Sequence, residues 1–176
     1  MKSRIAAATL VVLALAALAH AQDRRDARLA REVSRELAAL TSLTIFDHVE
    51  GTVVDGVVSL RGKVTMPYKK SEIERRISKM DGVGELRSQI EVLPASAYDD
   101  ELRRRIARAI YGDPAFWRYA AMAQPPIRII VENGRVTLSG LVHSHLDRLR
   151  ARSLASGFGE LSVTSELRTD DELRMN

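Results

Sequence analysis

One short run of the sequence places catalytic and metal-binding residue types close together: His143, Ser144, His145 and Asp147. Imidazole and carboxylate groups can ligate a metal ion or form an acid–base pair, and a serine can act as a nucleophile. However, His143 is expected to end a strand and His145 to begin a helix, so nothing in the spacing brings the rings together. Ser144, with Asp147 three residues later, fits a helix N-cap better than a nucleophile elbow. We therefore predict no catalytic residue, no metal site, no cofactor and no enzymatic activity.

Two other groups of side chains suit contact with a negatively charged surface. The first is predicted to cover the outer face of one helix, as Arg103, Arg104, Arg105 and Arg108. The second lies in the segment YGDPAFWRY, residues 111–119, as Phe116, Trp117, Arg118 and Tyr119. Aromatic rings favour the lipid headgroup layer, and arginine pairs with phosphate. The alternatives are a solvated helix face and an aromatic lid on the core. The same two interpretations apply to Lys69, Lys70, Arg75 and Arg76.

Composition narrows the class of protein. The chain has 27 basic and 23 acidic residues among 176, and no cysteine. Without Lys2 and Arg4, which lie in a segment expected to be removed, the net charge is near +2. Such a nearly neutral, interspersed charge pattern does not favour nucleic acid as a partner. The absence of cysteine excludes disulfides, thiolate metal sites and a lipid anchor on an N-terminal cysteine.

Residues 1–21 have the pattern of a signal peptide. Lys2 and Arg4 precede an apolar run from Ile5 to Leu18, which is short for a membrane span, and Ala19-His20-Ala21 supplies a small-x-small cleavage site. We expect cleavage after Ala21 and export to the periplasm, without a lipid anchor. The alternative is an uncleaved N-terminal anchor.

A hairpin pattern that occurs twice indicates the architecture. VEGTVVDGVVSLRGKV (residues 49–64) and PPIRIIVENGRVTLSGLV (residues 125–142) each alternate apolar and other residues around a two-residue turn. Those turns, Asp55-Gly56 and Asn133-Gly134, suit type I′ geometry, which requires positive φ at both positions. Gly62 and Gly140 occupy equivalent places in the second strands. An amphipathic helix precedes each hairpin, the first from Asp23 to Leu40, and a helix and a strand follow it.

The order helix, strand, strand, helix, strand therefore occurs twice. Because a crossover helix joins the second and third strands, these strands should run parallel. We predict an α/β (α+β) sandwich made of two tandem units, each a three-stranded mixed sheet with two helices on one face. The expected divisions are a first domain at 22–93, a linker at 94–98, a second domain at 99–169 and a charged tail at 170–176.

These motifs resemble the BON domain, a module of bacterial envelope proteins. The second copy resembles it most closely, in IIVENGRVTLSGLV (129–142) and GELSVTSELRT (159–169), and the first in VVDGVVSLRGKV (53–64) and GVGELRSQIEV (82–92). The resemblance implies a non-enzymatic role connected with phospholipid binding, envelope integrity, osmotic stress or periplasmic chaperoning. Several relatives carry a membrane-contacting aromatic residue where this chain has Glu101, so that contact is not carried over.

The expected function is weak, reversible binding to anionic phospholipid at a membrane surface, in envelope maintenance or protection against osmotic stress. Mature net charge near +2 implies that such binding fades with salt. The alternative is a periplasmic chaperone or adaptor that binds envelope proteins through an apolar patch or a sheet edge.

Overall fold

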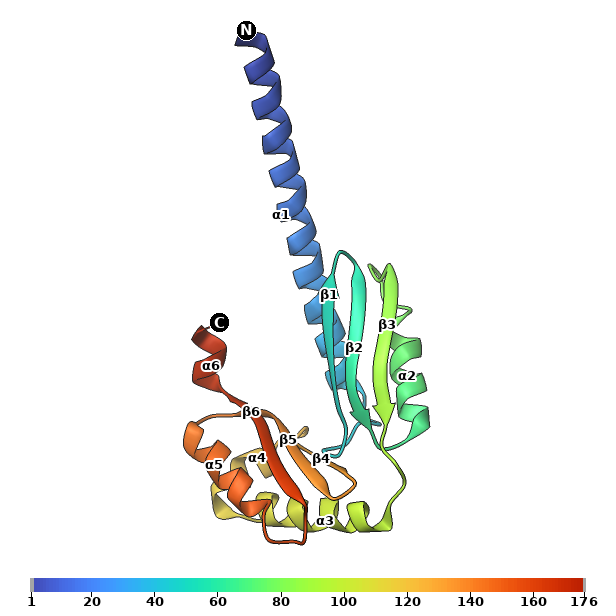
Figure 1. Cartoon of the computed structure of the whole chain (residues 1–176), viewed down its shortest axis with the longest axis vertical. Helices are drawn as coiled ribbons and strands as arrows, with labels where there is room; N and C mark the ends of the chain where they lie inside the picture. The colour runs from blue at the N-terminus through green and yellow to red at the C-terminus, as the bar shows by residue number, and fades with distance from the viewer. Residues whose placement is uncertain (1, 176) are drawn as a thin grey trace.

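The computed structural model describes residues 2–175, with side chains from Ala21 onward. Its first unit contains the elements α1 (Lys2–Ala39), β1 (His48–Val54), β2 (Val57–Val64), α2 (Pro67–Ile77) and β3 (Glu85–Val92). Its second unit contains α3 (Ala97–Tyr111), a 3-10 turn η1 (Pro114–Phe116), α4 (Trp117–Ala120), β4 (Ile127–Glu132), β5 (Arg135–Val142), α5 (His145–Leu154) and β6 (Ser162–Thr169). A short helix, α6 (Asp170–Met175), ends the chain. Figure 1 shows the two units one after the other, with α1 extending beyond the first.

Each unit is built around a three-stranded mixed sheet, as predicted. The strand orders are β1-β2-β3 and β4-β5-β6, with the first pair antiparallel and the second pair parallel. Helices α1 and α2 cover one face of the first sheet, and α3 and α5 cover one face of the second. The predicted fold class, two tandem α-β-β-α-β units, is confirmed.

The apolar stripes of the helices fill two separate cores. In the first unit Leu29, Val33 and Leu37 of α1 are buried in one cluster with apolar residues of β2, α2 and β3. In the second, the equivalent residues of α3 are Leu102, Ile106 and Ile110, and all three are buried. A hydrophobic stripe at helical spacing buries one face of the helix against the sheet, which is the main source of stability for such a unit.

The hairpin turns have the backbone geometry that their residue types require. Asp55 and Asn133 lie at φ 51° and 50°, and the glycines that follow them at 74° and 73°. Positive φ at both central positions matches the right-handed twist of the flanking strands. The type I′ prediction is therefore confirmed at both turns.

Helix ends also follow local sequence signals. Pro67 opens α2, and Ser144 caps α5 by accepting a hydrogen bond from the Asp147 amide at 3.1 Å. The charged tail forms α6, because Thr169 and Glu172 make a reciprocal capping box: each accepts from the other's backbone N–H, at 2.9 and 3.4 Å.

The structure describes only the backbone for most of the predicted signal peptide. Met1 and the side chains of residues 2–20 are not described, so the cleavage site after Ala21 stays a prediction. We expected a helix from Asp23, and α1 instead begins at Lys2. Among the described residues, no helix is sufficiently long and apolar to span a membrane.

Candidate contact surfaces and the junction between the units

The arginine-rich helix α3 exposes three of its four predicted contact residues. Arg104, Arg105 and Arg108 are exposed. Arg104 pairs with Glu101 at 2.8 Å, and Arg105 lies over the Phe158 ring at 5.1 Å. Within residues 21–175, no carboxylate lies within ion-pair distance of Arg108, so its charge is the most available for a ligand.

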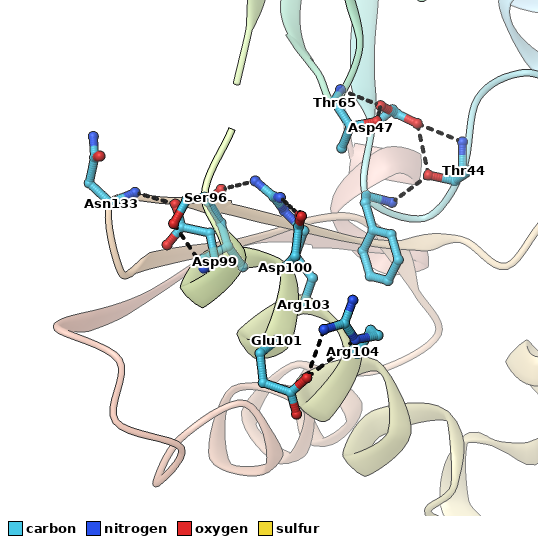
Figure 2. A network of polar contacts seen from close by, with 12 residues as sticks. Thr44, Asp47, Thr65, Ser96, Asp99, Asp100, Glu101, Arg103, Arg104 and Asn133 are labelled. Atoms are coloured by element: carbon cyan, nitrogen blue, oxygen red, sulfur yellow. Dashed lines mark hydrogen bonds and ion pairs between the residues drawn. The ribbon is translucent and has the colours of Figure 1, made fainter. Parts of the chain in front are cut away.

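Arg103 does not lie on the outer face of α3, and its predicted role as a surface contact is wrong. Its side chain is only 3% exposed. It forms an ion pair with Asp100 (Figure 2). It also donates a hydrogen bond to the carbonyl of Val131, near the end of β4. Arg103 lies next to Leu102, at the edge of the apolar stripe, so the helix directs it toward the sheet, where a free carbonyl accepts its N–H.

The aromatic insertion divides into a buried and an exposed part. Phe116 and Tyr119 are 0% and 2% exposed, so these two candidates are corrected to core residues. Trp117 is 75% exposed, and Arg118 is exposed as well. Residues three apart share one face of a helix, which places Phe116 and Tyr119 against the core and turns Trp117 outward. The insertion therefore closes the core and also carries an exposed tryptophan.

Tyr119 also contacts two residues of the segment 143–147, His143 and Asp147. Its hydroxyl donates to Asp147 at 2.7 Å and accepts from the His143 amide at 2.8 Å, while its ring stacks on His143. Burial, together with the hydrogen bond to Asp147, raises the pKa of Tyr119 to about 12. His143 Nδ1 lies 2.7 Å from Asp170, and His145 contacts Arg148. His143, His145 and Asp147 are thus each engaged in a structural contact.

Sequence reasoning missed a carboxylate that holds each hairpin turn. Asp26 of α1 accepts hydrogen bonds from the backbone N–H groups of Asp55 and Gly56, at 2.6 and 3.1 Å. Asp99 of α3 does the same for Asn133 and Gly134, both at 2.8 Å (Figure 2). In both units a carboxylate of the opening helix thus lies opposite the two turn N–H groups and accepts charge-assisted hydrogen bonds from them.

Replacing Asp99 with asparagine is expected to lower the free energy of unfolding by roughly 2 kcal/mol, since one of the two charge-assisted hydrogen bonds is lost and the other becomes a neutral one. The carboxylate offers two acceptors to two N–H groups, whereas the amide offers one acceptor and one opposing donor. Urea unfolding measures the change. Asp26→Asn, at a partly exposed position, should cost less. Equal stability of Asp99→Asn and wild type would contradict this role.

Lys69 is another correction, because it is a buried ion-pair partner and not a surface cation. Lys69 is 4% exposed and Asp47 2%, and their side chains meet at 2.6 Å. Asp47 also accepts hydrogen bonds from the backbone amide and hydroxyl of both Thr44 and Thr65 (Figure 2). This network fixes the loop between α1 and β1.

Comparison with known domains identifies the repeated unit. The BON domain matches residues 25–94 and again residues 98–170. The chain belongs to the BON-domain family. BON domains are of a phospholipid-binding type and occur in proteins that are generally non-enzymatic and typically periplasmic or otherwise associated with the envelope.

Two solved structures show weaker likenesses. The C-terminal domain of CdsD, the structural protein of the type III secretion system of Chlamydia trachomatis, has a TM-score of 0.34 and 11% identity, and the match covers 82% of this chain and 66% of that one. A second CdsD structure has a TM-score of 0.27 and 13% identity, covering 72% of this chain and 88% of that one. Scores this low carry no argument about function. No curated protein matches the chain.

The two BON domains meet through the loop that Asp47 fixes. Ile45 and Phe46 pack against the core of the second domain, and the Ile45 carbonyl accepts a hydrogen bond from the Ile129 amide of β4 at 2.7 Å. Lys63 of β2 pairs with Glu132 of β4 across the same junction. The loop thus covers part of the open edge of β4, which protects that edge from pairing with other strands.

Proposed function

We propose that the chain is a non-enzymatic periplasmic protein that binds anionic phospholipid surfaces weakly and reversibly through its second BON domain. Its role would be envelope maintenance or protection against osmotic stress. The proposed contact residues are Trp117, Arg118, Arg104, Arg105 and Arg108. The first domain, residues 22–93, and the second, residues 99–169, would be exported after cleavage at Ala21.

The observation that carries this proposal is the exposure of Trp117. Tryptophan is a large aromatic residue that usually packs, yet here 75% of its surface is exposed, next to the exposed Arg118. An indole ring favours the boundary between headgroups and acyl chains, where the neighbouring guanidinium can reach a phosphate. The insertion has no counterpart in the first domain, so this contact would be specific to the second.

The available charge implies modest affinity. Arg104 is paired with Glu101, and Arg105 is engaged with Phe158, which leaves Arg108 and Arg118 as the main charges for a lipid phosphate. A basic residue near an anionic surface contributes about 1 kcal/mol, and salt screens it. Binding should therefore require anionic lipid and weaken at high salt.

Adding anionic vesicles at low salt is expected to shift the tryptophan emission to shorter wavelength, as the indole leaves water. The chain has a single tryptophan, so the signal reports on Trp117 alone. Arg118→Glu replaces an attractive charge with a repulsive one and should weaken partitioning by about thirtyfold, from two charge increments of about 1 kcal/mol each. Co-sedimentation with neutral and anionic vesicles, at low and high salt, measures binding directly.

Arg75→Glu is the matched control, since it makes the same charge change on the exposed face of α2 in the first domain. It should weaken binding much less than Arg118→Glu. Equal losses in both variants would indicate a general charge effect, and unchanged emission from vesicle-bound protein would exclude Trp117 as the contact.

A second candidate function is a chaperone or adaptor for envelope proteins. Strands β3 and β6 lie at the edges of their sheets and provide backbone groups for an added strand. The exposed side chains of Tyr98 and Leu161 lie close together beside the Asn133-Gly134 turn. Absence of binding to any vesicle, together with crosslinking to proteins in the periplasm, would favour this function.

A further inference from the structure

Arg128 is a half-buried cation with unused hydrogen-bond donors at the junction of the two domains. It lies in β4, on the sheet face opposite α3 and α5, and within the described residues its guanidinium donates one hydrogen bond, to the carbonyl of Thr44 at 3.0 Å. Among the residues that the structure describes, no carboxylate lies within ion-pair distance of it. Arginine carries five N–H donors in a planar fork, so most of its capacity is left for another acceptor.

A cleft of about 440 Å³ opens beside this guanidinium. It lies between the C-terminal part of α1, strand β1 and the second domain, and Arg168 of β6 also lines it. Within residues 21–175, Arg168 makes one ion pair, an exposed contact of 3.5 Å with Glu50, which contributes little and can be exchanged for another anion. Two guanidinium groups therefore line one cleft.

The acidic groups in the cleft are already engaged. Asp47 accepts hydrogen bonds from Lys69, Thr44 and Thr65. Glu50 lies near both His48 and Arg168. Burial lowers the pKa of Arg128, and Tyr111 and Asp47 compensate only in part. The charge of Arg128 thus lacks a full counter-charge, and a bound anion would supply it.

The rest of the cleft is partly apolar. Leu37, Leu43, Val49 and Pro126 contribute to its lining. Polar groups that fix orientation beside an apolar wall are typical of small-ligand sites. A ligand with an acidic group next to a short apolar chain would match both the guanidinium groups and the apolar lining.

We propose that this cleft between the BON domains binds a phosphate group through Arg128, with Arg168 as a second donor. Arginine matches phosphate through paired N–H···O bonds, and two guanidinium groups suit the several oxygens of a phosphate. The phosphate can belong to a single-chain amphiphile or to a free phosphate ion. This site is separate from the Trp117 surface and does not depend on vesicle binding.

Calorimetric titration of the exported chain with octyl phosphate, below its micelle concentration, and with inorganic phosphate tests the proposal. Saturable one-to-one binding of either probe is expected. Binding of both would indicate a site for the free anion, and binding of octyl phosphate alone a site for an amphiphile. Arg128→Gln should weaken binding by about tenfold or more, because a hydrogen bond to a charged group is lost. No binding of either probe would overturn the proposal.

Two further variants separate the site from the fold. Ser34→Phe places a ring in the cleft without removing a charge, and should also weaken binding. Arg135→Gln removes an arginine from the same face of the sheet but outside this cleft, and should leave binding unchanged. Equal affinity of wild type and Ser34→Phe, or equal losses in Arg128→Gln and Arg135→Gln, would overturn the proposal. Arg118→Glu should not affect this binding, so the two lipid-related proposals fail independently.

Discussion

Replacing Asp47 with alanine is expected to lower the free energy of unfolding by about 3–5 kcal/mol, because it leaves a buried ammonium without its counter-charge. Asp47 and Lys69 are 2% and 4% exposed, and their charged atoms lie 2.6 Å apart. The same substitution removes the acceptor of the Thr44 and Thr65 amides. Urea unfolding followed by far-UV circular dichroism measures the loss.

The double variant Asp47→Ala/Lys69→Met is the control for this result. Replacing a buried ion pair with apolar groups is often nearly neutral, so methionine at position 69 should restore part of the lost stability. The exposed pair of Glu101 and Arg104 gives a second comparison, and Glu101→Ala should change stability far less. If Asp47→Ala behaved like Glu101→Ala, the buried pair would not be a source of stability.

The contribution of Asp47 to the free energy of unfolding should depend on pH. Burial by itself raises the pKa of Asp47, but hydrogen bonds from Lys69, Thr65 and Thr44 outweigh it and hold the pKa below its usual value. A carboxylate with a lower pKa in the folded state stabilises the fold above the unfolded pKa, near 3.9. That contribution is lost as the pH falls through the folded pKa. The difference between wild type and Asp47→Ala should therefore be large at neutral pH and shrink below about pH 4.

The sequence determined the fold because its signals were local and repeated. Asn133-Gly134 and Asp55-Gly56 each specify a turn through backbone conformation alone, and the alternation on either side specifies which face is buried. Ser144 and Pro67 mark helix starts for equally local reasons. None of these turn and helix-start signals depends on contacts with residues distant in the sequence.

The positions of charged and aromatic side chains depended on distant partners. Arg103 is buried because the carbonyl of Val131 accepts its hydrogen bond, and Lys69 because Asp47 pairs with it. Helical spacing places both residues near the edge of an apolar stripe, where either direction is open. For Phe116 and Tyr119 the available signal was their separation of three residues, which suits one inward face.

The turn-holding aspartates could have been found by comparing the two copies at polar positions. Asp26 precedes Leu29 by three residues, and Asp99 precedes Leu102 by three, so the carboxylate occupies the same place in both repeats. A polar residue at the same place in both copies of a structural repeat points to a structural role, because the two copies need not share a ligand. Helix-start geometry alone accounts for an acidic residue there, which is why the contact was not predicted.

Replacing Gly140 with alanine is expected to lower the free energy of unfolding by roughly 3 kcal/mol, from a backbone clash combined with conformational strain. A Cβ at this position would lie 2.0 Å from the carbonyl oxygen of Pro126, just before the neighbouring strand β4. Gly140 has a φ of +113°, a backbone conformation that residues with a Cβ rarely adopt. Gly62 meets the His48 carbonyl at the same 2.0 Å, so Gly62→Ala should have a similar effect on the first domain.

The variant Gly157→Ala separates the effect of conformational strain from that of the backbone clash. Gly157 also has positive φ, at +93°, but no atom of the described part of the chain lies within 4 Å of an added Cβ. This variant should show only the conformational strain, about 1 kcal/mol. Thermal unfolding of the three alanine variants gives the comparison. If Gly140→Ala and Gly157→Ala were equally destabilised, the close approach of β4 to β5 would be relieved by a strand shift, and the glycine would serve backbone conformation alone.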